Sequence, residues 1–188
     1  ILSDYKYFRV VLSPLSDRRI YELGMDSIPS ESECYPAKLA HGHVQWLIDE
    51  GVHTIFHPCV FFEHQETPDA QNHFNCPIVA SYAEALRLNI DELRTSDTQF
   101  LNPWLPYDKK EHLKKRLMVE LIEAHPELMG EGVSAPTQAE VDAAVDAAWA
   151  EDEAFKRDMR VKGTETLKWM EETGTHGIVL AGRPYHND

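Results

Sequence analysis

The chain has 188 residues, of which 43% are hydrophobic and 27% charged, an ordinary composition for a globular protein. Its 32 acidic and 18 basic residues give a net charge of −14, which repels phosphate backbones and anionic membranes, so we expect no nucleic-acid or membrane partner. No run approaches the ~20 apolar residues that span a bilayer, and no signal peptide opens the chain. Unpaired cysteines without a signal favour the cytoplasm.

The first predicted elements alternate between strand and helix. The short aromatic and β-branched run 7–12 predicts a buried strand. A helix over 17–23, ended by Gly24, is expected next, followed by a helix over 36–50 whose apolar residues recur at helical spacing. The run 52–56 then predicts a second strand.

The middle of the chain continues this alternation. Residues 60–75 are mostly polar and show no period, and they predict the longest loop. We expect a short strand over 77–80 that leads into a helix over 81–88, and a further strand over 98–101.

Two capping signals predict where the later helices begin. Asp108 with Glu111 resembles a capping box and precedes a helix with leucines along one face. Thr137 with Glu140 forms a second such pair and opens a long helix over 137–172.

The fold class expected from these elements is α/β. We predict a mainly parallel, Rossmann-like sheet with flanking helices, plus a long C-terminal helical segment. The α/β domain would cover 1–129, and the linker with the long helix 130–176. The apolar run 177–181 would be the first strand of a further, truncated α/β half at 177–188. Because the chain starts without methionine and stops soon after this run, we interpret it as part of a longer protein.

Three cysteines, each next to a proline or one residue from it, are the main chemical signal. Cys59 follows Cys34 by 25 residues, and Cys76 follows Cys59 by 17, so the short cysteine pairing of zinc fingers is missing. Three separated thiolates fit an iron–sulfur cluster with one open iron better. The alternative is three buried, inert thiols.

The predicted elements place two of the three cysteines where a metal ligand would be expected. In parallel sheets, sites form at the carboxyl ends of strands, and Cys59 is expected at such an end. Cys34 is expected at a helix start, where free N–H groups favour a thiolate. Cys76 precedes its predicted strand, so either the long loop brings it back or it is not a ligand.

Several other side chains could join a site. His57, His41 and His43 lie near the cysteines in sequence, and cysteine with histidine would suit zinc, a second metal hypothesis. Such histidines are more often half-buried or exposed. Lys38 lies one helical turn beyond Cys34 and could favour its thiolate form, or it is an ordinary exposed lysine.

Two catalytic motifs are absent from the sequence. There is no G-x-x-x-x-G-K-S/T and no other glycine-rich phosphate loop, so this chain alone should not hydrolyse ATP. There is also no G-x-S-x-G elbow, which leaves a serine triad unsupported.

The block Cys34-x-x-x-Lys38-x-x-x-Gly42-His43 resembles a known family. It is similar to the domain of unassigned function inside the large CoA-substrate-specific enzyme activases, often named activators of 2-hydroxyglutaryl-CoA dehydratase. The resemblance covers nearly the whole chain and continues through three further segments: 55–59, 74–79 and 182–186.

This resemblance implies a cofactor and its ligands. The domain is similar to 2-hydroxyacyl-CoA dehydratase subunits, whose three cysteines hold a four-iron four-sulfur cluster with an open iron. Carried over, the ligands would be Cys34, Cys59 and Cys76. Arg183 and His186 would form a binding loop that faces a cleft between the two halves, since arginine suits a carboxylate or phosphate.

Two functions remain as hypotheses. The first is an iron–sulfur electron-transfer or dehydratase-like module of an ATP-dependent activase, from an anaerobic host. Actin-like ATPase modules of the same parent would hydrolyse ATP, and the open iron would coordinate a small molecule or an acyl-CoA carbonyl. The second is a non-catalytic scaffold, with or without zinc, that docks the ATPase modules to a partner such as a dehydratase. Whether the chain is itself an enzyme stays open.

Overall fold

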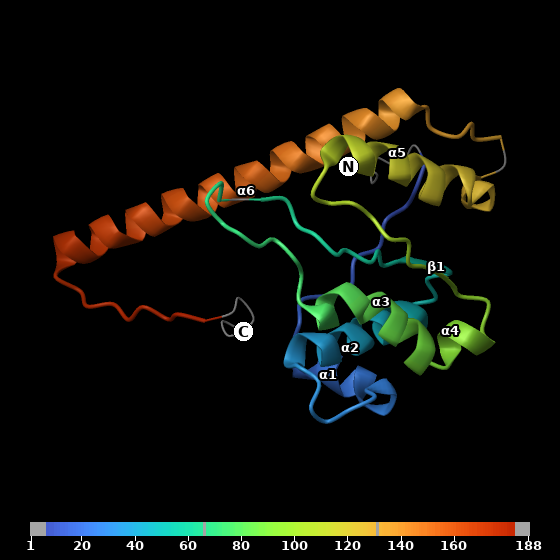
Figure 1. Cartoon of the computed structure of the whole chain (residues 1–188). Coiled ribbons are helices and arrows are strands. Elements are labelled where there is room, and N and C mark those ends of the chain that lie inside the picture. The colour runs from blue at the N-terminus through green and yellow to red at the C-terminus, as the bar shows by residue number, and fades with distance from the viewer. Residues whose placement is uncertain (1–6, 66, 131, 183–188) are drawn as a thin grey trace.

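The structure is a computed structural model that describes residues 7–65, 67–130 and 132–182 (Figure 1). Within these residues the chain is rich in helix and forms two short strands. In chain order the elements are α1 (Arg18–Gly24), a 3-10 turn (Met25–Ser27), α2 (Tyr35–Asp49), β1 (Thr54–Phe56), α3 (Pro77–Asn89), α4 (Glu92–Thr95), β2 (Gln99–Leu101), α5 (Lys110–Leu117), a π-helical turn (Met118–Glu123), a 3-10 turn (Pro126–Leu128) and α6 (Gln138–Thr173).

The two strands pair in parallel, with Ile55 of β1 opposite Phe100 of β2. An isolated parallel bridge between Cys59 and Trp104 continues the pairing beyond both strands. The connection between the strands contains α3, as a parallel pair requires a long crossover. The mixed α/β character and the parallel pairing are therefore confirmed, but the described residues do not form a wide Rossmann-like sheet.

Three predicted strands are wrong. Residues 7–12 run extended but form no strand, and Leu12 is 82% exposed. This segment instead lines an apolar cavity of about 1240 Å³ together with β1, α5 and α6. Residues 177–181 also form no strand, and Ile178 is 98% exposed. A strand needs a neighbour for its backbone hydrogen bonds, and both runs lack one among the described residues.

The third wrong strand is 77–80, which forms the first turn of α3. The physical reason is Pro77, because proline presets a helical φ and its missing N–H is not needed in a first turn. Ile78 and Val79 are apolar and β-branched, which is why the run resembled a strand. This correction moves Cys76 from a position before a strand to the start of a helix.

Of the two predicted capping boxes, one is present in the structure and the other is not. At α6 the Thr137 hydroxyl accepts from the backbone N–H of Glu140 at 3.4 Å, and the Glu140 carboxylate accepts from the Thr137 N–H at 2.9 Å, so this box is confirmed. The box at Asp108 is wrong: α5 begins at Lys110 after Lys109, with no side-chain cap.

The hydrophobic core has two parts. One joins α2, β1 and α3 through buried Val44, Ile55, Leu86 and Ile90. The other packs the end of β2 and the segment from α5 to the π-helical turn against the start of α6. Its buried residues are Leu101, Leu105, Leu113, Leu121, Ile122, Val141 and Val145.

Helices α1 and α2 cross at two glycines. A Cβ added at Gly42 would lie 1.7 Å from the carbonyl oxygen of Ile20, and one added at Gly24 would lie 2.3 Å from the backbone nitrogen of Gly42. Only glycine leaves the backbones room to approach this closely. The glycine of the Cys-x-x-x-Lys-x-x-x-Gly-His block is therefore a packing residue.

The second half of α6 extends away from the rest of the molecule (Figure 1). Large hydrophobic side chains are exposed along it, namely Phe155, Met159, Val161, Leu167 and Trp169. Even so, none of the helices described, α6 included, combines the length and apolar character of a membrane span.

Candidate functional site

The three cysteines occupy two kinds of position. Cys34 is the N-cap residue of α2 and Cys76 that of α3, and neither side chain caps its own helix. Cys59 lies just beyond β1, where its N–H donates to the carbonyl of Pro103 at 2.9 Å and its own carbonyl accepts from Leu105 at 3.0 Å. The expected positions of Cys34 and Cys59 are confirmed, and Cys76 now stands in the same setting as Cys34.

All three thiols are free, but they differ in exposure. Cys34 is half-buried and Cys76 is exposed, while Cys59 is only 1% exposed. Burial raises the pKa of the Cys59 thiol, and the negative charge of Glu84 raises it further. The two thiols at helix starts are thus the more accessible ones, and the third is buried.

Helix α3 brings the cysteines into one region. The Tyr82 hydroxyl forms a hydrogen bond with Cys34 Sγ at 3.9 Å. The pKa of Tyr82 is raised chiefly by burial and by that hydrogen bond, and further by the charges of Cys34, Cys76 and Glu33. Besides burial, the negative charge of Glu84, two residues after Tyr82 on α3, raises the pKa of Cys59. Each thiol thus lies near a residue of α3: Cys34 near Tyr82, Cys59 near Glu84, and Cys76 at the N-cap.

Tyr82 was not predicted from the sequence. The signal that would have found it is the helical start at Pro77, because a helix beginning there carries Tyr82 in its second turn, near the N-cap residue Cys76. The mistaken strand over 77–80 hid this relation.

The described residues offer no close group of three ligands for a single metal ion that includes a cysteine. One ion needs its ligand atoms close together, since zinc–sulfur bonds are only ~2.3 Å long. Across the described ranges, the one group of three metal-binding side chains whose ligand atoms lie within 4.8 Å of one another is His64, Asp152 and Glu153, which contains no cysteine. In a cluster each cysteine binds a different iron, so its ligands lie farther apart.

Lys38 holds the loop before Cys34 in place. Its Nζ donates to the carbonyl of Glu31 at 2.8 Å and lies 3.9 Å from the Glu31 carboxylate. The Lys38 side chain is only 14% exposed, so it is not an ordinary surface lysine. Its contacts fix the loop that presents Cys34.

His57 lies two residues before Cys59 and beside the ring of Phe100, with the ring centroids 6.2 Å apart. Its Nδ1 is buried and has no hydrogen-bond partner among the described residues. Burial lowers the pKa of His57, opposed in part by the carbonyls of His57 and Pro58. The ring is therefore neutral near pH 7 and keeps one nitrogen available.

His41 and His43 belong to the packing of α1 and α2. Nδ1 of the buried His41 lies 2.8 Å from the Ser27 hydroxyl, and Nε2 of His43 lies 3.0 Å from the Ser16 hydroxyl. These contacts give both rings structural partners. Arg183 and His186 lie outside the described residues, so the binding loop and the cleft between halves stay predictions.

Stability is expected to fall as the pH drops through 6.5. Burial lowers the pKa of His41, so it folds neutral, whereas the unfolded chain binds a proton near pH 6.5. The free energy of unfolding is therefore unaffected by protonation of His41 above pH 6.5. Below pH 6.5 it falls by up to about 1.4 kcal/mol per pH unit, because the unfolded chain binds a proton that folded His41 does not. Urea unfolding at pH 7.5 and 5.5 measures this slope. His41→Gln should flatten it, and the same change at the exposed His53 should not; equal slopes in both variants would contradict the assignment.

The geometry defines a helix-rich α/β domain with three free thiols, each near a residue of α3. A family model described as the CoA enzyme activase uncharacterised domain matches residues 7–188, and the chain belongs to this family. The resemblance drawn from the cysteine block is thus confirmed. Searches of curated proteins and of solved structures found no match.

Proposed function

We propose that the domain is the iron–sulfur module of an ATP-dependent CoA enzyme activase. The observation that carries this proposal is that each thiol lies near α3: Cys34 Sγ lies 3.9 Å from the Tyr82 hydroxyl, Cys76 is the N-cap residue of the helix, and, besides burial, the negative charge of Glu84 raises the pKa of Cys59. Three thiols from three separate segments near one helix suit a cluster with one open iron.

The residues of this chain would have distinct roles. Cys34, Cys59 and Cys76 would hold the cluster, which supplies a low-potential electron carrier when bound. The starts of α2 and α3 contribute free N–H groups and partial positive charge, which stabilise anionic sulfur. The buried segment at Cys59 would keep water from one side of the site.

The partners follow from the same proposal. ATPase modules of the parent chain would drive electrons to this domain in the cytoplasm, and the recipient would be a dehydratase or its acyl-CoA substrate.

Anaerobic reconstitution with iron and sulfide tests the proposal. We expect about four iron atoms per chain and the broad visible absorption of a cluster. Changing Cys34, Cys59 and Cys76 together to serine should remove the iron, while circular dichroism checks that the helices remain. His53→Gln serves as a control that keeps every thiol. Negligible iron in the original protein, or equal iron in the triple variant, would rule the cluster out.

A second candidate is a scaffold that docks the ATPase modules to a partner. The observation in its favour is the exposed apolar side chains along the second half of α6, such as Phe155 and Leu167. Surfaces of this kind mark interaction sites. This candidate expects Cys34→Ser to leave the activity of the full-length activase unchanged, whereas the cluster proposal expects that activity to be lost.

A further inference from the structure

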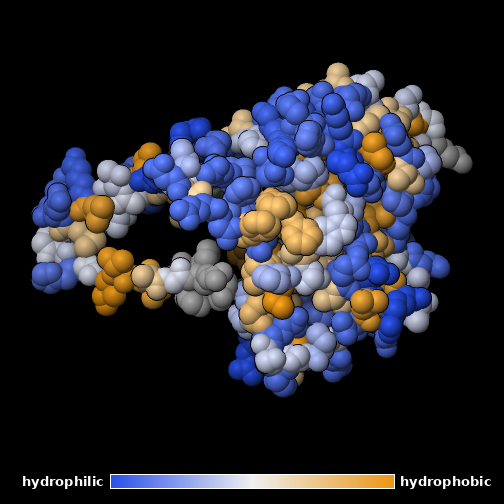
Figure 2. All heavy atoms as spheres, viewed as in Figure 1, coloured by the Kyte–Doolittle hydropathy of each residue, from blue (hydrophilic) through white to orange (hydrophobic). Residues whose placement is uncertain are grey.

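A second pocket lies beside the segment that carries Cys59. Its volume is about 610 Å³, within the ~300–1,000 Å³ usual for small-molecule sites. One wall comes from residues 61–62 and 104–106, and the other from residues 108–109 and from α5. In the view of Figure 2, hydrophobic atoms gather near the centre of the face, below a hydrophilic surface formed by the helices.

The first wall is an aromatic platform. The rings of Phe61 and Trp104 stack with centroids 4.8 Å apart and an interplanar angle of 22°. Both side chains are substantially exposed, Phe61 at 50% and Trp104 at 42%. An exposed stacked pair of rings can accept another flat ring, and such stacking contributes about 1–3 kcal/mol per nucleic-acid base.

The second wall is basic. Five of the 18 lysines and arginines of the chain lie in residues 109–116, although the chain carries a net charge of −14. Lys109, His112, Lys115 and Arg116 line the pocket. His112, Lys115 and Arg116 lie on one face of α5 because they are three and four residues apart, and Lys109 is the N-cap residue of that helix. The local charge is thus opposite to that of the protein as a whole.

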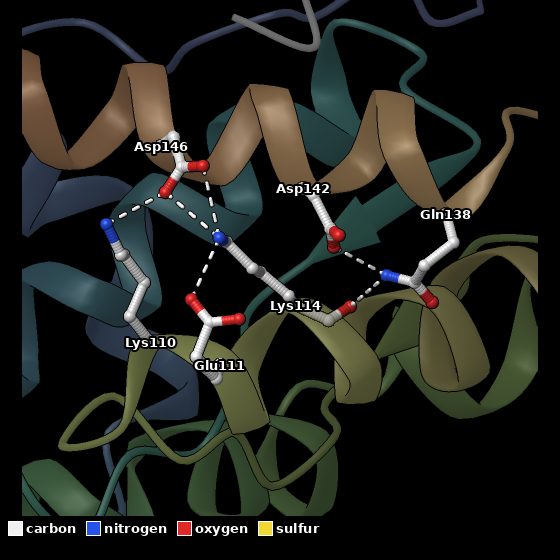
Figure 3. A network of polar contacts seen from close by, with 6 residues as sticks. All are labelled: Lys110, Glu111, Lys114, Gln138, Asp142 and Asp146. Atoms are coloured by element: carbon white, nitrogen blue, oxygen red, sulfur yellow. Dashed lines mark hydrogen bonds and ion pairs between the residues drawn. The ribbon is translucent and has the colours of Figure 1, made fainter.

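The remaining two lysines of this run point elsewhere. Figure 3 shows Lys110 and Lys114 directed at Asp146 of α6, with Nζ–carboxylate distances of 2.8 and 3.1 Å. Lys114 also binds Glu111 at 2.9 Å. These contacts join α5 to α6 and leave the opposite face of α5 to the pocket.

The cations of the pocket are only partly neutralised. Arg116 pairs with Glu120, and Lys109 lies 3.9 Å from Asp108, the one acidic residue that lines the pocket. Lys115 makes no ion pair within the described part of the chain and is exposed. It is therefore available to an anionic ligand.

The geometry points to an adenosine polyphosphate as the ligand of this pocket. A flat base would stack on Phe61 and Trp104, and phosphate groups would bind Lys109, Lys115 and Arg116, since lysine and arginine bind phosphate through charge-assisted hydrogen bonds. The nucleotide end of CoA and a free adenine nucleotide share this chemistry. Binding without hydrolysis agrees with the missing phosphate loop in the sequence.

The position of the pocket ties it to the thiol site. Trp104 forms a β-bridge with Cys59, and Phe61 lies two residues after Cys59. A ligand seated on the platform would therefore lie beside the backbone that presents the buried thiol. This inference goes beyond the proposed cluster and does not depend on iron.

Calorimetric titration of the iron-free protein with CoA, ATP, ADP, adenosine and inorganic triphosphate tests the inference. We expect CoA or the adenine nucleotides to bind more tightly than adenosine or triphosphate alone, because only they use both walls. Tighter binding of CoA than of ADP would assign the nucleotide end of CoA, and equal binding would assign adenine nucleotides in general. Triphosphate binding as tightly as ATP, or no nucleotide binding at millimolar concentration, would overturn the inference.

Two matched pairs of variants locate the site. Lys115→Ala should weaken nucleotide binding about tenfold, because it removes one charge-assisted contact to phosphate. Lys168→Ala is the control: it removes the same charge from the exposed part of α6 and should leave nucleotide binding unchanged. Trp104→Ala should likewise weaken binding, and Trp169→Ala should not. Trp104→Phe keeps an aromatic ring and should retain most of the affinity. Unchanged affinity in Lys115→Ala and Trp104→Ala would place the ligand elsewhere and refute this site.

Discussion

Gly42→Ala is expected to destabilise the domain by about 3 kcal/mol or more, a large effect for one methyl group. The added Cβ would lie 1.7 Å from the carbonyl oxygen of Ile20 and 2.6 Å from its carbonyl carbon. Both are backbone atoms, so no side-chain rotation relieves the overlap. Helices α1 and α2 would have to separate, which exposes Ile20 and the buried His41.

Urea unfolding followed by circular dichroism measures this loss, and the chain supplies a matched control. Gly163 also lies inside a helix, α6, but an added Cβ there meets nothing within 4 Å. Gly163→Ala should therefore stabilise the protein by about 0.5–1 kcal/mol, because alanine is the better helix former. If both variants shift stability in the same direction, the close crossing of α1 and α2 is wrong.

The sequence block on which the family resemblance rests, Cys34 to His43, contains residues of two kinds. Cys34, at one end, is a proposed ligand whose Sγ lies 3.9 Å from the Tyr82 hydroxyl. Gly42 and His43, at the other end, hold α1 against α2 through close backbone contact and through Ser16. A pattern of residues shows that these positions go together, but it does not show which of them act on a ligand and which pack.

The helices could be predicted because their signals are local. The α6 boundaries follow from the capping box at Thr137 and from Gly174, whose φ of +67° ends the helix. Strands are different, since a strand exists only where a neighbour accepts its hydrogen bonds. The runs 7–12 and 177–181 have the composition of strands without such a neighbour among the described residues, which no local pattern could reveal.

The candidate sites were predicted in part for a similar reason. The three thiols were visible as residue types, and only their surroundings had to await the structure. The pocket next to Cys59 was not predicted. Its two walls lie on separate segments, and the parallel bridge that joins Cys59 to Trp104 is a tertiary contact.

Leu86→Ala is expected to lower the free energy of unfolding by about 2–5 kcal/mol, the usual range for a buried leucine. Leu86 is 1% exposed and packs with Val44 of α2, Ile55 of β1 and Ile90. Urea unfolding compares it with Leu88→Ala on the same helix, where the side chain is 55% exposed and the expected change is within about 0.5 kcal/mol.

The same pair of variants separates packing from chemistry at the thiol site. Because α3 carries Cys76 and Tyr82, a cavity at Leu86 would loosen the helix near which the proposed cluster ligands lie, without removing any of those three cysteines. Reconstituted Leu86→Ala should therefore still bind iron at low temperature, where it remains folded, but should lose it on heating before Leu88→Ala does. If the two variants lose iron at the same temperature, the packing of α3 against α2 and β1 does not hold the thiols together.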